Sequence, residues 1–143
     1  MICFDTSYLL KCYLAEPGHL VVRALAEQQG PVACCALGKT EWHAGVHRHL
    51  REGKLTAPQA GLVYQVMQAD DAAVLWAWLP LSDAVLAAAN REFERLPASV
   101  FLRSADALHL ACARHHGFAE IYSNDRHLLA AAPQFGLAGK NVI

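Results

Sequence analysis

Two patterns of apolar residues alternate along the chain: short continuous runs, and longer stretches with apolar residues every three or four positions. Short apolar runs bounded by turn residues are typical of strands buried on both faces, and the longer spacing is typical of amphipathic helices. The runs predict strands at residues 2–4, 32–36, 73–81 and 121–122. The spacing predicts helices at residues 8–14, 19–29, 37–50, 57–68, 83–95, 105–115 and 128–132, with capping hydroxyls from Thr6–Ser7, Thr56, Ser82 and Ser104 before four of them. Strands alternating with helices predict an α/β fold, a mainly parallel sheet flanked by helices on both faces.

Length and charge limit the classes of protein to consider. The 143 residues are 55% hydrophobic and 17% charged, which fits one compact domain spanning residues 1–143. Twelve Lys and Arg against 13 Asp and Glu give a net charge of -1, so any polyanion must be bound locally. No apolar run is long enough to cross a bilayer, and the N-terminus lacks the pattern of a signal peptide. We expect a cytoplasmic protein.

Cysteine and histidine do not dominate the predicted chemistry. The five cysteines are an odd number, form no C-x-x-C pair and lie in apolar stretches, so a disulfide scaffold is not favoured. His43 and His47 lie one helical turn apart, but no Cys/His tetrad accompanies them, and zinc is not favoured either.

Four acidic residues stand out because they lie at the ends of predicted strands or near the starts of predicted helices. Asp5 ends the first strand, Glu41 lies about one turn into the helix after the second strand, Asp106 opens a helix, and Asp125 follows the last strand. In an open parallel sheet, sites assemble at the carboxyl ends of strands. Carboxylates gathered there without matching cations would repel one another, and Mg²⁺ or Mn²⁺ would relieve that repulsion. Such a site is suited to hydrolysis of a phosphodiester by a metal-activated water.

Each acid also has an ordinary structural interpretation. Asp5 could cap a helix, Asp106 could complement a helix dipole, and Asp125 could stabilise a turn. Glu41, on a mostly apolar helix, would have to face water or a cation.

The segments that carry these acids are considered together, because their order along the chain is informative. They are Asp5-Thr6-Ser7, Glu41, the stretch from Leu102 to Ala111, and the stretch from Ser123 to Leu128. In this order and in a chain of this length, they resemble the PIN domain, specifically the VapC-type toxins of bacterial and archaeal toxin–antitoxin pairs. The resemblance covers essentially the whole chain.

The resemblance implies a PIN-like fold and a Mg²⁺- or Mn²⁺-dependent endoribonuclease acting on structured RNA such as tRNA or rRNA. Its implied metal and catalytic residues are Asp5, Glu41, Asp106 and Asp125, and the residues implied to orient them or the metal-bound water are Thr6, Ser7 and Ser123. It also implies a homodimer and a VapB-like antitoxin that covers the site. The chain departs from the family at Cys35-Ala36, where a hydroxyl residue is usual, and this predicts looser support around Glu41.

Other residues near the acids have two interpretations each. Arg103 and Arg126 lie within three residues of a proposed ligand and are candidates to hold the RNA backbone, or else are solvated surface residues. For His109, packing within its helix is favoured over a role as general base. Trp76 and Trp78 share one strand face, and a place in the core is favoured over base stacking.

Apolar residues in two helical stretches predict faces that one core does not cover, available to a dimer or an antitoxin. They are Tyr8, Leu9, Tyr13, Leu14, Val63, Tyr64 and Met67. The complete pattern predicts a VapC-like endoribonuclease toxin of a type II toxin–antitoxin system. The alternative is a non-catalytic PIN-like RNA- or protein-binding module, which would gain nothing from a cluster of like charges. A phosphoacceptor domain would need a matching lysine or nucleophile motif, and none is found.

Overall fold

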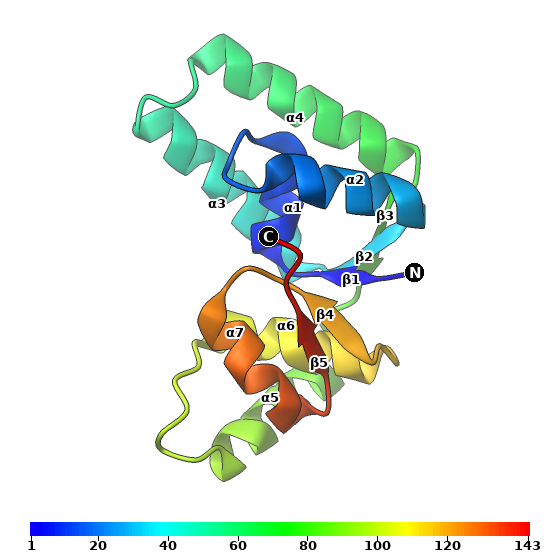
Figure 1. The fold of residues 1–143 in the computed structure, drawn as a ribbon, viewed down its shortest axis with the longest axis vertical. Coiled ribbons are helices and arrows are strands. Elements are labelled where there is room, and N and C mark those ends of the chain that lie inside the picture. The colour runs from blue at the N-terminus through cyan, green and yellow to red at the C-terminus, as the bar shows by residue number, and fades with distance from the viewer.

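The computed structural model describes residues 1–143 and has a five-stranded, fully parallel sheet between two groups of helices (Figure 1). The strands lie in the order β3-β2-β1-β4-β5, with α1–α4 on one face and α5–α7 on the other. The strands are β1 (Cys3–Phe4), β2 (Val32–Cys35), β3 (Trp76–Leu79), β4 (Glu120–Tyr122) and β5 (Ala138–Lys140). The helices are α1 (Thr6–Tyr13), α2 (His19–Gln29), α3 (Leu37–Arg51), α4 (Ala57–Ala72), α5 (Asp83–Arg95), α6 (Ser104–His115), α7 (Arg126–Ala131) and the 3-10 helix η1 (Ala132–Phe135). The predicted α/β class is confirmed.

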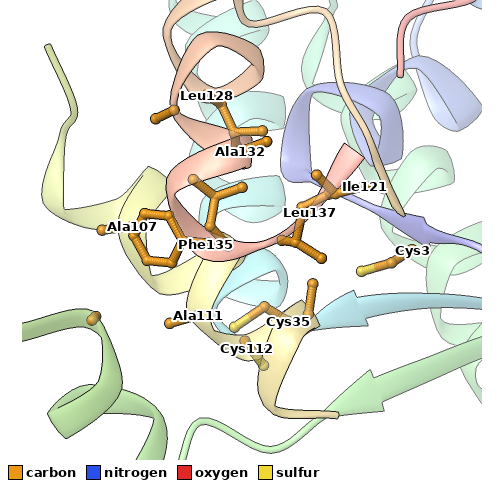
Figure 2. Packing of buried hydrophobic residues seen from close by; sticks show 14 of the residues in the cluster. Cys3, Cys35, Ala107, Ala111, Cys112, Ile121, Leu128, Ala132, Phe135 and Leu137 are labelled. Atoms are coloured by element: carbon orange, nitrogen blue, oxygen red, sulfur yellow. The ribbon is translucent and has the colours of Figure 1, made fainter. Parts of the chain in front are cut away.

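The sheet divides the core in two because successive side chains of a strand point to opposite faces. Phe4 and Cys34 pack among α1–α4, whereas Cys3, Cys35 and Ile121 pack among α5–α7. Figure 2 shows the second of these clusters, where the sulfur atoms gather between the sheet and the helices. Burial on both faces explains why the strands read as continuous apolar runs rather than as alternating ones.

Helix starts agree with the capping prediction at two places and differ at two others, one of which is α6, where Ser104 is the first helical residue, Arg103 is the N-cap and no side chain caps the helix. The side chains of Thr56 and Ser82 accept hydrogen bonds from backbone N–H groups three residues on, as predicted. The cap of α1, however, is Asp5 rather than Thr6 or Ser7; its Oδ1 accepts from a backbone N–H at 3.1 Å. The extended backbone that ends β1 leaves Asp5 in the N-cap conformation, so its carboxylate reaches the free N–H groups first.

Other elements also differ from the sequence prediction. The third strand is limited to Trp76–Leu79, because α4 extends to Ala72 and is followed by a turn in which Val74 has a φ of 57°. The last helix begins two residues early, at Arg126. No apolar run predicted β5, which is exposed throughout and pairs only with β4.

The prediction of uncovered apolar faces was wrong for most of the residues it named. Tyr8, Leu9, Leu14 and Met67 are buried in the core beside α1–α4. Exposed leucines and valines occur instead on α2, on α4 and in the turn that follows α4: Leu20, Val21, Leu62, Val66, Val74 and Leu75. No helix has both the length and the apolar character required to span a bilayer.

Candidate active site

The four acids predicted from strand ends and helix starts line a single pocket of about 550 Å³. Asp5 directly follows β1 and Asp125 follows β4, while Glu41 and Asp106 extend from α3 and α6. Thr6, Ser7, Arg103 and His109 also line the pocket, as does Arg48, which the sequence did not single out. Arg126 is exposed and is not among the lining residues.

Asp5 is held at the base of this pocket by the two predicted serines. Ser7 Oγ donates to Asp5 Oδ1 at 2.7 Å, and Ser123 Oγ donates to Asp5 Oδ2 at 2.6 Å. Only 4% of Asp5 is exposed. Burial raises the pKa of Asp5 above its ordinary value, and the bonds from Ser123 and Ser7 limit that rise. The carboxylate of Asp5 is therefore fixed in orientation, and no Lys, Arg or His side chain forms an ion pair with it.

Asp125 combines the structural role that the sequence allowed with a place in the pocket. Its Oδ1 caps α7 by accepting from the backbone N–H of His127 at 2.8 Å and of Leu128 at 3.1 Å. Burial alone would raise the pKa of Asp125, but these backbone bonds and the charge of Arg103 outweigh it and lower the pKa. Its Oδ2 remains directed at Arg103.

Arg103 forms ion pairs with two of the acids. Its Nε atom lies 2.7 Å from Asp106 Oδ2, and its Nη2 atom lies 2.5 Å from Asp125 Oδ2. The bond to Asp106, together with the charges of Asp106 and Asp125, raises the pKa of Arg103 above its ordinary value. The side chain predicted to hold RNA therefore neutralises carboxylates of the pocket in this conformation.

Glu41 has two partners: Thr6, which the resemblance implied to orient the acids or the metal-bound water, and His109, which was not predicted to contact it. Thr6 Oγ1 donates to Glu41 Oε2, and His109 Nε2 lies 2.6 Å from the same oxygen. Burial would raise the pKa of Glu41, but the hydrogen bond and charge of His109, with help from Thr6 and Arg103, lower it. Burial alone would lower the pKa of His109. The hydrogen bond to Glu41 and the charge of Glu41 outweigh burial, so the pKa of His109 is raised.

His109 is both a buried residue, as predicted, and a pocket residue, which was not predicted. It is 3% exposed, its Nε2 lies 3.1 Å from Thr6 Oγ1, and its Nδ1 has no protein partner. The available signal was its spacing of three residues from Asp106, which places both side chains on one face of α6.

The departure at Cys35-Ala36 does not leave Glu41 without support. Cys35 faces the other side of the sheet, where it lies with Cys112 in the core cluster shown in Figure 2, and both cysteines are free. The expected loosening is therefore not seen, because Thr6 and His109 hold the glutamate. Trp76 packs in the core and Trp78 packs against it, as predicted.

The donor set suits a hard divalent cation, because carboxylate oxygens are the ligands that Mg²⁺ and Mn²⁺ prefer. No three His, Cys, Asp or Glu side chains converge on one point in this conformation, however. Arg103 and His109 occupy carboxylate oxygens that such an ion would use. A cation held by these residues would require Arg103 to move away from Asp106 and Asp125.

Comparison with known proteins shows the family to which this chain belongs. The family model described as PIN domain matches residues 2–133, and the chain belongs to the PIN domain family. Comparison with curated protein sequences gives no match.

Solved structures share the fold at low sequence identity. FitAcB from Neisseria gonorrhoeae aligns with a TM-score of 0.71 and 19% identity over 99% of this chain and 97% of that chain. VapC20 from Mycobacterium tuberculosis, described as a sarcin-ricin loop cleaving toxin, aligns with a TM-score of 0.68 and 16% identity over 92% and 95% of the two chains. A toxin-antitoxin complex from Klebsiella pneumoniae aligns with a TM-score of 0.63 and 17% identity over 94% of each chain.

Proposed function

We propose that this protein is a VapC-like endoribonuclease, the toxin of a type II toxin–antitoxin pair, acting on RNA in the cytoplasm. The observation that carries the proposal is that Asp5, Glu41, Asp106 and Asp125 line one pocket of a PIN domain. The similar folds of a sarcin-ricin loop cleaving toxin and of a toxin-antitoxin complex support it. Structured RNA such as tRNA or rRNA is the proposed substrate.

In this proposal the four acids hold Mg²⁺ or Mn²⁺. When bound, the cation would activate a water for attack on phosphorus and stabilise the negative charge that develops. Ser7 and Ser123 keep both oxygens of Asp5 oriented, and Thr6 and His109 keep Glu41 turned toward the pocket.

Arginine side chains are proposed to hold the RNA backbone. Arg48 and Arg103 line the pocket, and Arg126 is exposed beside Asp125. Local contacts of this kind are needed because the net charge of -1 provides no general attraction to RNA.

The proposed partners are a VapB-like antitoxin and a second copy of this chain. The exposed leucines and valines of α2 and α4 offer apolar surface for such contacts. Light scattering on the purified protein, alone and co-expressed with the product of a neighbouring gene, tests both. A monomer at micromolar concentration contradicts the homodimer, and failure to co-purify contradicts that antitoxin.

Cleavage of a labelled total-RNA pool tests the activity. Purified protein is assayed with Mg²⁺, with Mn²⁺ and with EDTA, beside Asp5→Asn and Asp106→Asn. The control is Asp83→Asn, which removes an exposed carboxylate at the start of α5. We expect cleavage that EDTA, Asp5→Asn and Asp106→Asn abolish and Asp83→Asn preserves. If folded wild-type protein cuts no RNA under any condition, the alternative of a non-catalytic binding module replaces the proposal.

A further inference from the structure

An aromatic pair with one exposed ring lies beside the pocket and is used neither by the core nor by the chemistry proposed above. Phe101, in the loop between α5 and α6, contacts the imidazole of His127 in α7, with ring centroids 4.6 Å apart and planes tilted by 59°. Phe101 is 59% exposed. Figure 1 shows this loop rising beside the start of α7. The contact holds the phenyl ring in place while leaving more than half of the residue accessible.

The chain connections put this aromatic pair at the rim of the pocket. Phe101 is two residues before Arg103, whose guanidinium is paired inside the pocket. His127 is two residues after Asp125 and donates its backbone N–H to that carboxylate at 2.8 Å. Two residues of extended chain span at most about 7 Å. A molecule that reached the carboxylates would therefore pass close to both rings.

Arginine side chains flank the pair on both sides. Arg126 Nε donates to His127 Nε2 at 3.3 Å, and Arg103 lies on the pocket side. An exposed phenyl ring contributes little to folding, since its area stays in contact with water. Aromatic rings next to arginines are how proteins bind single-stranded nucleic acid: a base stacks on the ring and the adjacent phosphate contacts the cation.

We propose that Phe101 and His127 form a stacking surface for one unpaired RNA base, next to the phosphate that enters the acidic pocket. This inference rests on the proposed ribonuclease function and adds the form of the substrate. A base inside a duplex is stacked on its neighbours and cannot lie on the ring, so the surface selects loops, bulges or single strands. Phe101 is a positioning residue in this scheme.

Binding measured without cleavage tests the stacking surface separately from the nuclease activity. Two fluorescein-labelled RNA octamers are compared by anisotropy in Ca²⁺ and in EDTA: one of mixed sequence, and one with the same ribose-phosphate backbone but no bases. Phe101→Ala removes the ring, and Phe101→Tyr keeps it. Phe93→Ala is the matched control, because Phe93 is also an exposed phenylalanine, 41% accessible, on α5.

We expect wild-type protein to prefer the base-bearing octamer. Phe101→Ala should weaken binding of that octamer by about 5- to 150-fold, the range typical of losing one base–aromatic stack, and leave binding of the abasic octamer unchanged. Phe101→Tyr and Phe93→Ala should retain the preference. Equal binding of the two octamers by wild-type protein, including no binding of either, overturns the proposal, as does a Phe101→Ala variant that retains the preference.

The two proposals fail in different ways. If wild-type protein cleaves RNA but Phe101→Ala does not change base-dependent binding, the nuclease stands and the stacking surface is rejected. If base-dependent binding through Phe101 occurs without cleavage under any metal condition, the surface stands and the nuclease is rejected. If Phe101→Ala impairs binding of a co-purifying protein and leaves RNA binding intact, the ring belongs to a protein interface and the stacking surface is rejected.

Discussion

Arg103 and Asp125 form an ion pair across the pocket, with 2.5 Å between Nη2 and Oδ2. The same guanidinium reaches Asp106 through Nε at 2.7 Å, so one side chain joins the start of α6 to the start of α7. These contacts use carboxylate oxygens that a divalent cation would need. Pairing of Arg103 and binding of a cation therefore compete for the same atoms.

This competition predicts that Arg103→Ala binds Mn²⁺ more tightly than wild-type protein in the absence of RNA. Two partly exposed ion pairs contribute roughly 1 kcal/mol together, which corresponds to about fivefold in affinity. Isothermal titration calorimetry measures the change. Arg95→Ala is the matched control, because Arg95 pairs with Glu92 at the same spacing of three residues but does not line the pocket. Unchanged or weaker Mn²⁺ binding by Arg103→Ala contradicts the competition.

Asp5→Asn should stabilise the protein at neutral pH while abolishing the proposed cleavage. Burial raises the pKa of Asp5 above its ordinary value, so folding favours the protonated carboxyl over the charged one. The sign follows from proton linkage: the stability associated with this group is highest below its unfolded pKa, near about 4, and is lost as pH rises through the higher folded value. Asparagine carries no charge at any pH and avoids this loss.

Urea denaturation of both proteins between pH 3 and pH 7 measures the effect. The free energy of unfolding of Asp5→Asn should exceed that of wild-type protein at pH 7, and the difference should shrink toward pH 3. A variant less stable than wild-type protein at pH 7 would mean that the cap of α1 and the bonds to Ser7 and Ser123 outweigh the burial of charge.

The fold could be predicted where buried elements have a recognisable pattern of apolar residues. Strands β1, β2 and β4 read as short apolar runs because both of their faces are covered. The edge strand β5 has no such apolar run. Ala138, Gly139 and Lys140 are all exposed, and only backbone pairing with β4 defines them as a strand. Pairing of that kind depends on the rest of the sheet, which a local pattern cannot reveal.

The site could be predicted as a set of acids but not as a set of contacts. Strand ends and helix starts are local features, and they located Asp5 and Asp125 beside one pocket. The partners of the acids come from distant segments, since His109 and Glu41 are 68 residues apart in sequence. Which residue neutralises which carboxylate depends on how α3 packs against α6, and that is a tertiary property.

Gly45 allows α1 and α3 to approach closely next to the pocket, and Gly45→Ala should separate them. A Cβ at this position would lie 2.5 Å from Leu10 Cδ2 and 2.8 Å from Leu10 Cδ1, on a buried side chain. Overpacking of this kind costs about 1–3 kcal/mol. Glu41 lies one turn earlier on α3, so the proposed cleavage should fall together with stability.

Gly61→Ala in α4 is the matched control for this substitution. A Cβ at Gly61 meets nothing within 4 Å, so alanine should stabilise the helix by about 0.5–1 kcal/mol without altering the pocket. Thermal denaturation should show lower stability for Gly45→Ala and higher stability for Gly61→Ala. RNA cleavage should decrease only in Gly45→Ala. Equal stability of the two variants would mean that Leu10 relocates without strain.

Removing His109 should change the charge state of Glu41. Burial raises the pKa of this glutamate and His109 makes the largest opposing contribution, so His109→Ala should leave burial dominant and move the pKa upward. The carboxylate form, present in wild-type protein above its lowered pKa, would then appear only at higher pH. The acid limb of the pH profile of RNA cleavage should shift upward, with about 10- to 100-fold lower cleavage at neutral pH, as is typical when a residue that supports a ligand is lost.

His109→Gln separates this electrostatic effect from simple loss of packing. Glutamine fills part of the same space and can donate a hydrogen bond to Glu41, but it carries no positive charge. We expect its acid limb to lie between those of wild-type protein and His109→Ala, with thermal denaturation confirming that both variants are folded at the assay temperature. A uniform decrease in cleavage with no shift of the acid limb in either variant would limit His109 to packing, because loss of packing alone does not move the pH profile.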